Sequence, residues 1–311
     1  MRKALLIGID DYPNDPLDGC VNDAVAVENT IEKHGDGSPN FAVQRKDNIA
    51  TSGELRTSID ELFAGDADVA LLYFSGHGFF DSTGGYLVTP DHQKGDAGLS
   101  MDVILNIANN SKIKNKVIVF DCCHSGAFGS PANMAAAAQL AEGVVILTAS
   151  RDNESAIEID GHGVFTELFV DALQGGAATL TGDITPGSIY AYIDQALGAW
   201  DQRPVFKTNV NQFISLRKTV PPIETSILRK ITAYFESIES EHQLDPSYEP
   251  TEEPKNEINE AIFSELQKMN RVGLVAPVGE EHMYYAAMNS KSCKLTTLGA
   301  QYWRHVQSGK I

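Results

Sequence analysis

Two short motifs in this 311-residue chain carry side chains that could perform nucleophilic catalysis. Residues 75–78 read Ser-Gly-His-Gly, and residues 121–126 read Asp-Cys-Cys-His-Ser-Gly. A thiol attacks a carbonyl group well only as the thiolate, and a nearby imidazole produces that form by taking the proton. We therefore consider His77 a candidate base and a cysteine of the second motif a candidate nucleophile.

Both motifs come directly after apolar runs of the kind that form buried parallel strands. Strands are expected at residues 3–9, 41–44, 68–74, 116–120, 144–148 and 206–213, and helices at residues 21–34, 52–63, 101–109, 163–175 and 185–197. Strands that alternate with helices predict an α/β domain with a mostly parallel central sheet. Functional groups of such sheets gather beyond the carboxyl ends of the strands, so the two motifs should lie at one edge.

The choice between the two adjacent cysteines stays open at this level. Side chains alternate in direction along a strand, and this alternation alone does not separate Cys122 from Cys123. Cys123 lies one residue farther from the strand, just before a Ser-Gly turn. Backbone N–H groups in that turn, and one near Gly78, could stabilise the oxyanion of a tetrahedral intermediate.

The composition is that of a globular, acidic protein. Hydrophobic residues make up 42% and charged residues 21% of the chain, and the formal net charge is -18. Residues 1–220 hold 15 Lys and Arg against 29 Asp and Glu, which gives this part a net charge of -14. Such a surface repels nucleic acid and anionic membranes and attracts basic peptides, although a solvated acidic surface without a binding role is the plain alternative.

The four cysteines do not form a disulfide framework or a zinc motif. The apolar run near the amino terminus is too short for a signal peptide, and no segment approaches the roughly 20 apolar residues that cross a membrane. We therefore expect a reducing, cytoplasmic setting, in which a nucleophilic thiol survives, and no membrane partner.

The texture of the sequence changes after residue 220, and we expect domains at residues 1–218 and 219–311. Helices at 223–240 and 258–270, a loop at 245–255, a hairpin region across 272–295 and a helix at 296–306 predict a small helical or winged-helix-like module. Residues 221–311 have a net charge of -4, which does not favour nucleic acid. A regulatory or interaction domain that recruits a protein partner is the expectation.

The two motifs resemble the catalytic segments of metacaspases and other caspase-like cysteine peptidases, which read Ser-Gly-His-Gly and Asp-x-Cys-His-Ser-Gly. Cys122 falls on the x, so the resemblance assigns the nucleophile to Cys123, 46 residues after His77. Five further stretches in family order support the resemblance. They are residues 4–9, 17–24, 147–150, 154–156 and 161–166, so that the likeness spans roughly residues 3–215.

The resemblance implies a caspase-like three-layer sandwich and a cysteine endopeptidase with a Cys123–His77 dyad. Metacaspases cut protein or peptide substrates after Arg or Lys, and the family's two pocket acids fall on Asp23 and Asp121. A guanidinium between two carboxylates forms charge-assisted hydrogen bonds. The alternatives are that Asp23 caps a helix and that Asp121 merely ends a strand.

Residues 117–150 contain no Lys or Arg, so an enzyme with this specificity could not cut itself there. We expect activity as a single chain. Two other functions fit the same residues, namely a catalytically silent scaffold and a peptide ligase that uses the same dyad.

No cofactor or metal is assigned from the sequence. Some metacaspases need calcium, but no EF-hand loop is present. The candidate acids are scattered, and calcium stays unassigned among Asp10, Asp11, Asp15, Asp18, Asp91 and Asp96.

Overall fold

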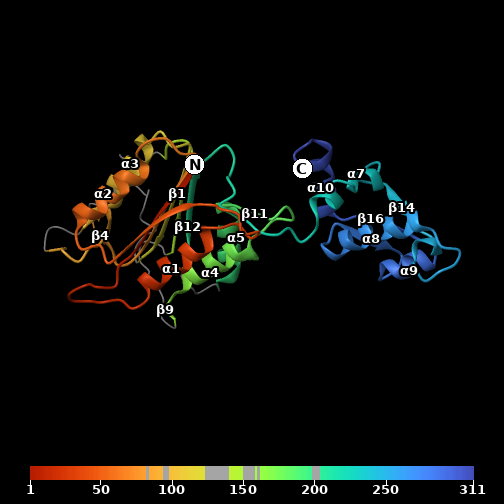
Figure 1. The fold of residues 1–311 in the computed structure, drawn as a ribbon, viewed down its shortest axis with the longest axis horizontal. Helices are drawn as coiled ribbons and strands as arrows, with labels where there is room; N and C mark the ends of the chain where they lie inside the picture. Colours follow the sequence, from red (N-terminus) through yellow and green to blue (C-terminus); the bar gives the residue numbers. More distant parts are fainter. Residues whose placement is uncertain (82–83, 94–97, 123–139, 150–157, 160–161, 198–203) are drawn as a thin grey trace. The chain divides into compact units, whose positions relative to one another are not determined.

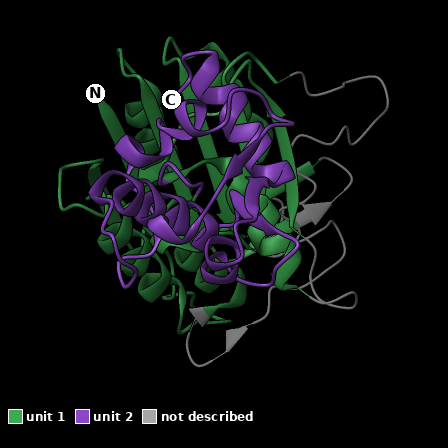
Figure 2. Cartoon of the chain, turned by 90° about the vertical axis from the view of Figure 1, so that its right-hand side faces the viewer, with its two compact units in different colours: residues 1–178, 183–220 green, residues 179–182, 221–311 purple. Residues whose placement is uncertain are grey.

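The computed structural model describes the chain except for residues 82–83, 94–97, 123–139, 150–157, 160–161 and 198–203. The chain forms two compact units, which Figure 2 colours separately. The first unit holds residues 1–178 and 183–220, and the second holds residues 179–182 and 221–311. Each unit has its own hydrophobic core.

A six-stranded sheet forms the centre of the first unit, in the order β12-β8-β7-β3-β1-β2. Neighbouring strands are parallel except for β12, which runs antiparallel to β8. The strands are β1 (Arg2–Gly8), β2 (Ala42–Asp47), β3 (Val69–Ser75), β7 (Asn115–Asp121), β8 (Val144–Thr148) and β12 (Val205–Asn209). The prediction of a mostly parallel central sheet is confirmed.

Helices cover both faces of this sheet, which gives the predicted three layers (Figure 1). Leu5 and Ile7 of β1 pack with α2 and α3, whereas Leu6 packs on the opposite face with α1, α4 and α5. This division follows from the alternation of side chains along a strand, and it explains why the strands are apolar throughout. The helices are α1 (Cys20–Ile31), α2 (Ser52–Phe63), α3 (Met101–Asn110), α4 (Val164–Asp171), continued by η2 (Ala172–Gly176), and α5 (Pro186–Ala196).

Smaller sheets complete the first unit. A three-stranded sheet follows His77, and two short antiparallel pairs lie later in the chain. Their strands are β4 (Gly78–Asp81), β5 (Gly84–Leu87) and β6 (Leu99–Ser100), then β9 (Glu158–Ile159) with β10 (His162–Gly163), and β11 (Asp183–Ile184) with β13 (Arg217–Lys218). Gly84 and Gly85 open β5. A Cβ at Gly85 would lie 2.7 Å from the sulfur of Met101, so a side chain there would require the Met101 side chain to move.

The second unit contains a three-stranded antiparallel sheet in the order β14-β16-β15, surrounded by helices. Its elements are α6 (Thr225–Leu228), α7 (Ile231–Tyr234), β14 (Glu241–Gln243), η3 (Pro246–Tyr248), α8 (Glu257–Arg271), β15 (Val275–Val278), α9 (Met283–Met288), β16 (Ser292–Leu295) and α10 (Thr297–Gln307). Leu180, from the short excursion at residues 179–182, packs against this core, and its N–H donates to the Tyr302 hydroxyl at 3.2 Å.

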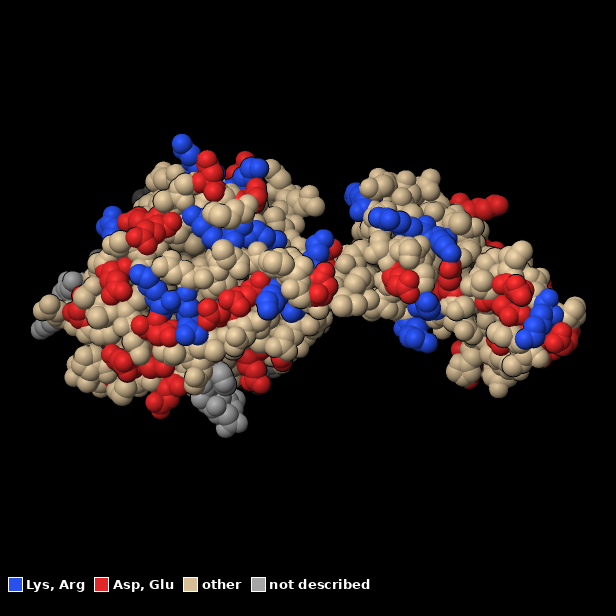
Figure 3. All heavy atoms as spheres, viewed as in Figure 1, with Lys and Arg blue, Asp and Glu red and all other residues tan. Residues whose placement is uncertain are grey.

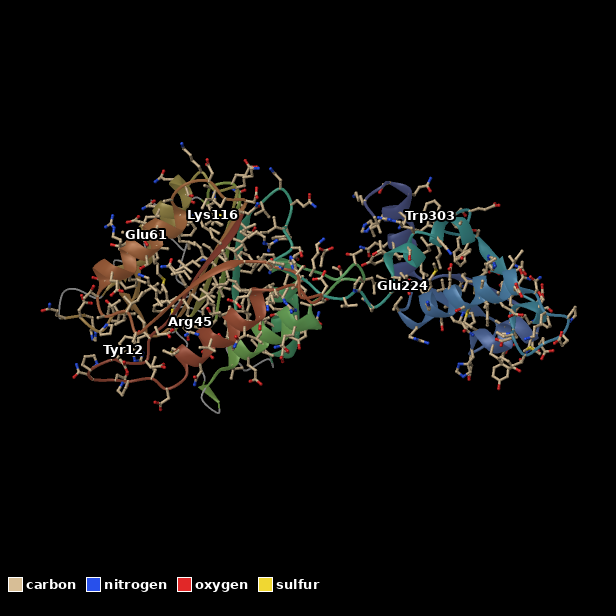
Figure 4. All side chains as sticks on the ribbon, in the orientation of Figure 1. Tyr12, Arg45, Glu61, Lys116, Glu224 and Trp303 are labelled. Carbon is tan, nitrogen blue, oxygen red and sulfur yellow. The ribbon has the colours of Figure 1, made fainter. Side chains whose placement is uncertain are left out.

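Two elements of the second unit differ from the sequence prediction. The expected helix at 223–240 is two short helices, and it ends where Phe235 turns extended and its carbonyl accepts the Trp303 indole N–H at 2.8 Å (Figure 4). Residues 283–289 are expected in a hairpin region, but residues 283–288 form α9. Its buried residues Met283, Ala286 and Ala287 have the spacing of one helical face.

On the face drawn in Figure 3, acidic side chains are interleaved with lysines and arginines in each unit. Among the described residues, no helix is both long and apolar enough to cross a membrane.

Candidate active site

The carboxyl ends of β3 and β7 bring the two sequence motifs together. Ser75, the last residue of β3, is the register partner of Asp121, the last residue of β7. The Gly76 N–H donates to the Asp121 carbonyl oxygen at 3.3 Å. The predicted juxtaposition of the His77 segment and the start of the second motif is thus confirmed. Cys123 itself lies outside the described residues, as do His124, Ser125 and Gly126.

His77 is held by the loop that follows β1. Its Nε2 lies 2.7 Å from the Asp15 carbonyl oxygen. A carbonyl oxygen can only accept, so Nε2 carries the hydrogen in the neutral ring, and Nδ1 is then the nitrogen that can take a proton. The Asp15 carboxylate lies 3.5 Å from the same Nε2, with its side chain largely exposed. The Asp15 carbonyl therefore leaves Nδ1 as the ring nitrogen that can accept a proton.

The start of α1 is fixed by Asp10, and this places Asp23 within the first turns of the helix. The Asp10 carboxylate accepts the N–H groups of Cys20 at 2.8 Å and Val21 at 3.2 Å, which satisfies donors at the helix start. A Cβ on Gly8 would lie 2.3 Å from the Cys20 carbonyl oxygen, so glycine lets β1 approach α1. The Asp10 carboxylate thus caps α1, while the Asp23 carboxylate accepts the N–H of Gly163, the residue before α4.

Asp23 and Asp121 are both buried, and their carboxylates converge on Gly163. A Cβ built on Gly163 would lie 2.5 Å from Asp121 Oδ2 and 3.2 Å from Asp23 Oδ2. The Gly163 N–H donates to both Asp23 oxygens at 3.3 Å, and the Ser75 hydroxyl donates to Asp23 Oδ2 at 3.1 Å. Asp121 does end β7, as the alternative had it, but its side chain also belongs to this pair.

A short chain of hydroxyl groups holds the Asp121 carboxylate. The Thr166 hydroxyl donates to Asp121 Oδ2 at 2.6 Å, and the Tyr73 hydroxyl lies 2.5 Å from Thr166 Oγ1. Since the Thr166 hydrogen is given to Asp121, the Tyr73 hydroxyl is the donor to Thr166. Burial raises the pKa of Tyr73 well above its ordinary value, and the negative charges of Asp23 and Asp121 raise it further. Tyr73 therefore stays a proton donor at neutral pH.

The cysteines that the structure describes are packed. Cys122 is 1% exposed and belongs to the core between the sheet and α2 and α3, as expected for a residue that packs. Cys20 and Cys293 are also buried. Burial raises the pKa of the Cys20 thiol strongly and that of Cys293 to about 12, so neither forms a thiolate readily at neutral pH.

Gly78 opens β4 next to His77 and is half-buried. Among the calcium candidates, Asp10 caps α1, and Asp91 accepts from the Ser52 N–H at 3.2 Å at the start of α2. Asp96 lies outside the described residues. Within the described ranges, no group of three or more His, Cys, Asp or Glu side chains could hold a metal ion.

Sequence reasoning gave no role in holding this site to Tyr12, Asp15, Ser75, Gly163 or Thr166, and it considered Asp15 only as a calcium candidate. Ser75, Gly163 and Thr166 lie in stretches whose resemblance to a family was noticed, so the signal was present without a role. Tyr12 and Asp15 lie in a turn-rich loop, where nothing in the residue pattern indicates contact with His77.

The family described as Caspase domain (Peptidase_C14) matches residues 1–230. Two solved structures are similar, each with a TM-score of 0.52 over 70% of this chain. Protein GSU0716 from Geobacter sulfurreducens is 18% identical, with 97% of its chain covered, and caspase-1 from Spodoptera frugiperda is 15% identical, with 90% covered. At these sequence identities the two structures show only that the fold is shared. No curated protein matches the sequence.

Proposed function

Because this chain belongs to the caspase-domain family, we propose that it is a cysteine endopeptidase with Cys123 as nucleophile and His77 as base. The observation that carries the proposal is the hydrogen bond between His77 Nε2 and the Asp15 carbonyl. It leaves Nδ1 as the basic nitrogen, on a loop beside the strand that leads to Cys123. An imidazole in this state is ready to accept a thiol proton.

In the proposed reaction the Cys123 thiol gives its proton to His77, and the sulfur attacks the carbonyl carbon of the scissile peptide. Backbone N–H groups, including that of Gly78, stabilise the oxyanion that forms. The C–N bond then breaks, and protonated His77 gives its proton to the leaving amine. Water hydrolyses the resulting thioester and restores the thiol.

We further propose that Asp23 and Asp121 select a basic residue before the scissile bond. The support is the convergence of two buried carboxylates on Gly163, where no Cβ stands in the way. Buried carboxylates favour a cationic partner, and a guanidinium presents several donors in one plane. The excess of Asp and Glu in residues 1–220 also attracts basic peptides.

A panel of fluorogenic peptides with Arg, Lys, Asp or Asn before the scissile bond tests the function. We expect cleavage of the Arg and Lys peptides, little cleavage of the other two, and none by the Cys123→Ala variant. Cleavage after Asp alone would contradict the role of the two carboxylates.

The panel also separates the alternatives. A silent scaffold would cleave none of the four peptides, and its Cys123 would not react with an arginine-based electrophile. A ligase would transfer the acyl group to an added amine rather than to water, which mass spectrometry of the products distinguishes.

The chain is expected to remain uncut between residues 123 and 150 while active, because residues 117–150 lack Lys and Arg. The measurement is amino-terminal sequencing of all fragments that form during incubation of wild-type and Cys123→Ala protein. A cut in this interval that appears only in the wild-type protein would contradict the expectation.

For the second unit we propose a regulatory role through a protein partner. Its sheet order β14-β16-β15, with α6 and α7 before β14 and α8 before β15, supports a winged-helix-like arrangement, in which α9 joins β15 to β16 in place of the expected hairpin. The net charge of -4 over residues 221–311 supports a protein partner over nucleic acid.

A further inference from the structure

Tyr12 contacts His77 in two independent ways. Its ring centroid lies 4.5 Å from that of the imidazole, at an angle of 57°. Its hydroxyl accepts the backbone N–H of His77 at 3.0 Å. Tyr12 lies on the loop that follows β1 (Figure 4) and is 3% exposed, so it reaches His77 from a distant part of the sequence through the core of the first unit.

The same hydroxyl also fixes the strand beside His77. It donates to the Val88 carbonyl oxygen at 3.1 Å, and the Val88 N–H donates to the His77 carbonyl oxygen at 3.0 Å. His77, Val88 and Tyr12 thus form a closed set of three hydrogen bonds. Without the hydroxyl, the His77 N–H and the Val88 carbonyl would both lose a partner near the core, which is costly.

The surroundings leave room for this hydroxyl and keep it protonated. A Cβ on Gly76 would lie 2.6 Å from the Tyr12 oxygen, so any side chain before His77 would force this hydroxyl to move. Burial raises the pKa of Tyr12 far above its ordinary value. The group therefore donates and accepts at the same time throughout the neutral range.

We propose that Tyr12 is a positioning residue for His77, which holds the backbone through its hydroxyl and the plane of the imidazole through its ring. Asp15 and Tyr12 lie three residues apart in one loop, and together they fix the ring, one at Nε2 and the other at its face and backbone. The contribution of Tyr12 to catalysis rests on the proposed peptidase function. Its restraint on the His77 imidazole does not depend on that function.

The Tyr12→Phe variant removes the hydroxyl and keeps the ring. We expect kcat on an arginyl peptide to fall by about 10- to 100-fold, since small misplacements of a reacting group cost about that much, while KM changes by less than about twofold. Tyr12→Leu, which also removes the ring, should lose more. The matched control is Tyr248→Phe, which removes a buried hydroxyl 3.1 Å from His242 in the second unit and should leave kcat unchanged.

A second measurement does not need activity. The ring nitrogens of His77, assigned in ¹⁵N spectra by comparison with His77→Gln, should report the Nε2–H tautomer in the wild-type protein. Tyr12→Phe should show a mixture of the two tautomers, and Tyr248→Phe should not.

The two measurements separate the two proposals. Wild-type ring signals and wild-type kcat in folded Tyr12→Phe protein would overturn the positioning role. An inactive wild-type protein whose His77 signals still change in Tyr12→Phe would support the positioning role and contradict the peptidase proposal. If circular dichroism shows that Tyr12→Phe does not fold, a folded Gly76→Ala protein replaces it, because the added methyl group displaces the Tyr12 hydroxyl. Unchanged His77 ring signals in this variant would overturn the positioning role.

Discussion

The His77→Gln variant is expected to lose about 10³- to 10⁴-fold in kcat/KM on an arginyl peptide, because glutamine cannot take the thiol proton. Glutamine can still donate to the Asp15 carbonyl, so the loop should stay in place. The control is His242→Gln in the second unit, whose histidine also contacts a backbone carbonyl, that of Tyr234, at 3.1 Å. That variant should cleave at the wild-type rate.

Alkylation of Cys123 by iodoacetamide at varied pH shows whether the loss arises at the thiol. The wild-type protein should react rapidly near neutral pH, and His77→Gln should need a pH near the ordinary thiol value of about 8.5. Peptide mapping should find the label on Cys123, because Cys20, Cys122 and Cys293 are buried. Equal rates for both proteins at pH 7 would contradict the role of His77 as base.

The Asp121→Asn variant should lose about 10²- to 10³-fold in kcat/KM on arginyl peptides and much less on a peptide with a neutral residue before the scissile bond. A buried arginine of the substrate that faces one carboxylate instead of two loses several kcal/mol of binding free energy. Asparagine can still accept the Thr166 hydroxyl through its amide oxygen, so the fold should persist. Asp23→Asn should behave alike, since both carboxylates face Gly163.

Asp91→Asn is the control for these variants. The Asp91 carboxylate accepts a hydrogen bond from the Thr89 hydroxyl at 2.6 Å, the same distance as between Thr166 and Asp121. It contacts the first residue of α2 and not the candidate pocket. It should leave the ratio of arginyl to neutral cleavage unchanged. If Asp23→Asn and Asp121→Asn also leave that ratio unchanged, the two carboxylates do not select the substrate.

The sequence predicts the central layers well because burial on both faces makes a parallel strand a continuous apolar run. β3 and β7 are such runs, and the motifs that follow them meet as expected. The elements of the second unit are harder to predict from sequence, because they are short and leave few residues to define a period. α9 was missed although Met283, Ala286 and Ala287 mark one helical face.

The supports of the site were beyond sequence reasoning for a different reason. The contact between Tyr12 and His77 spans 65 residues, and that between Gly163 and Asp23 spans 140. Such contacts depend on which strands become neighbours, and local patterns do not encode that. Asp10 as the cap of α1 was missed for the same reason, since a cap normally comes from the residue next to the helix.

Ser75 donates to Asp23 from β3, but two other donors to the acidic side chains, Gly163 and Thr166, come late in the chain. Asp23, His77 and Asp121 leave the ribosome before Gly163 and Thr166, which orient both carboxylates. A nascent chain that has been synthesised only to residue 150 therefore has the reactive groups without the arranged pocket. If Asp23 and Asp121 select the substrate as proposed, the order of synthesis places this selection after nearly all of the first unit has been made.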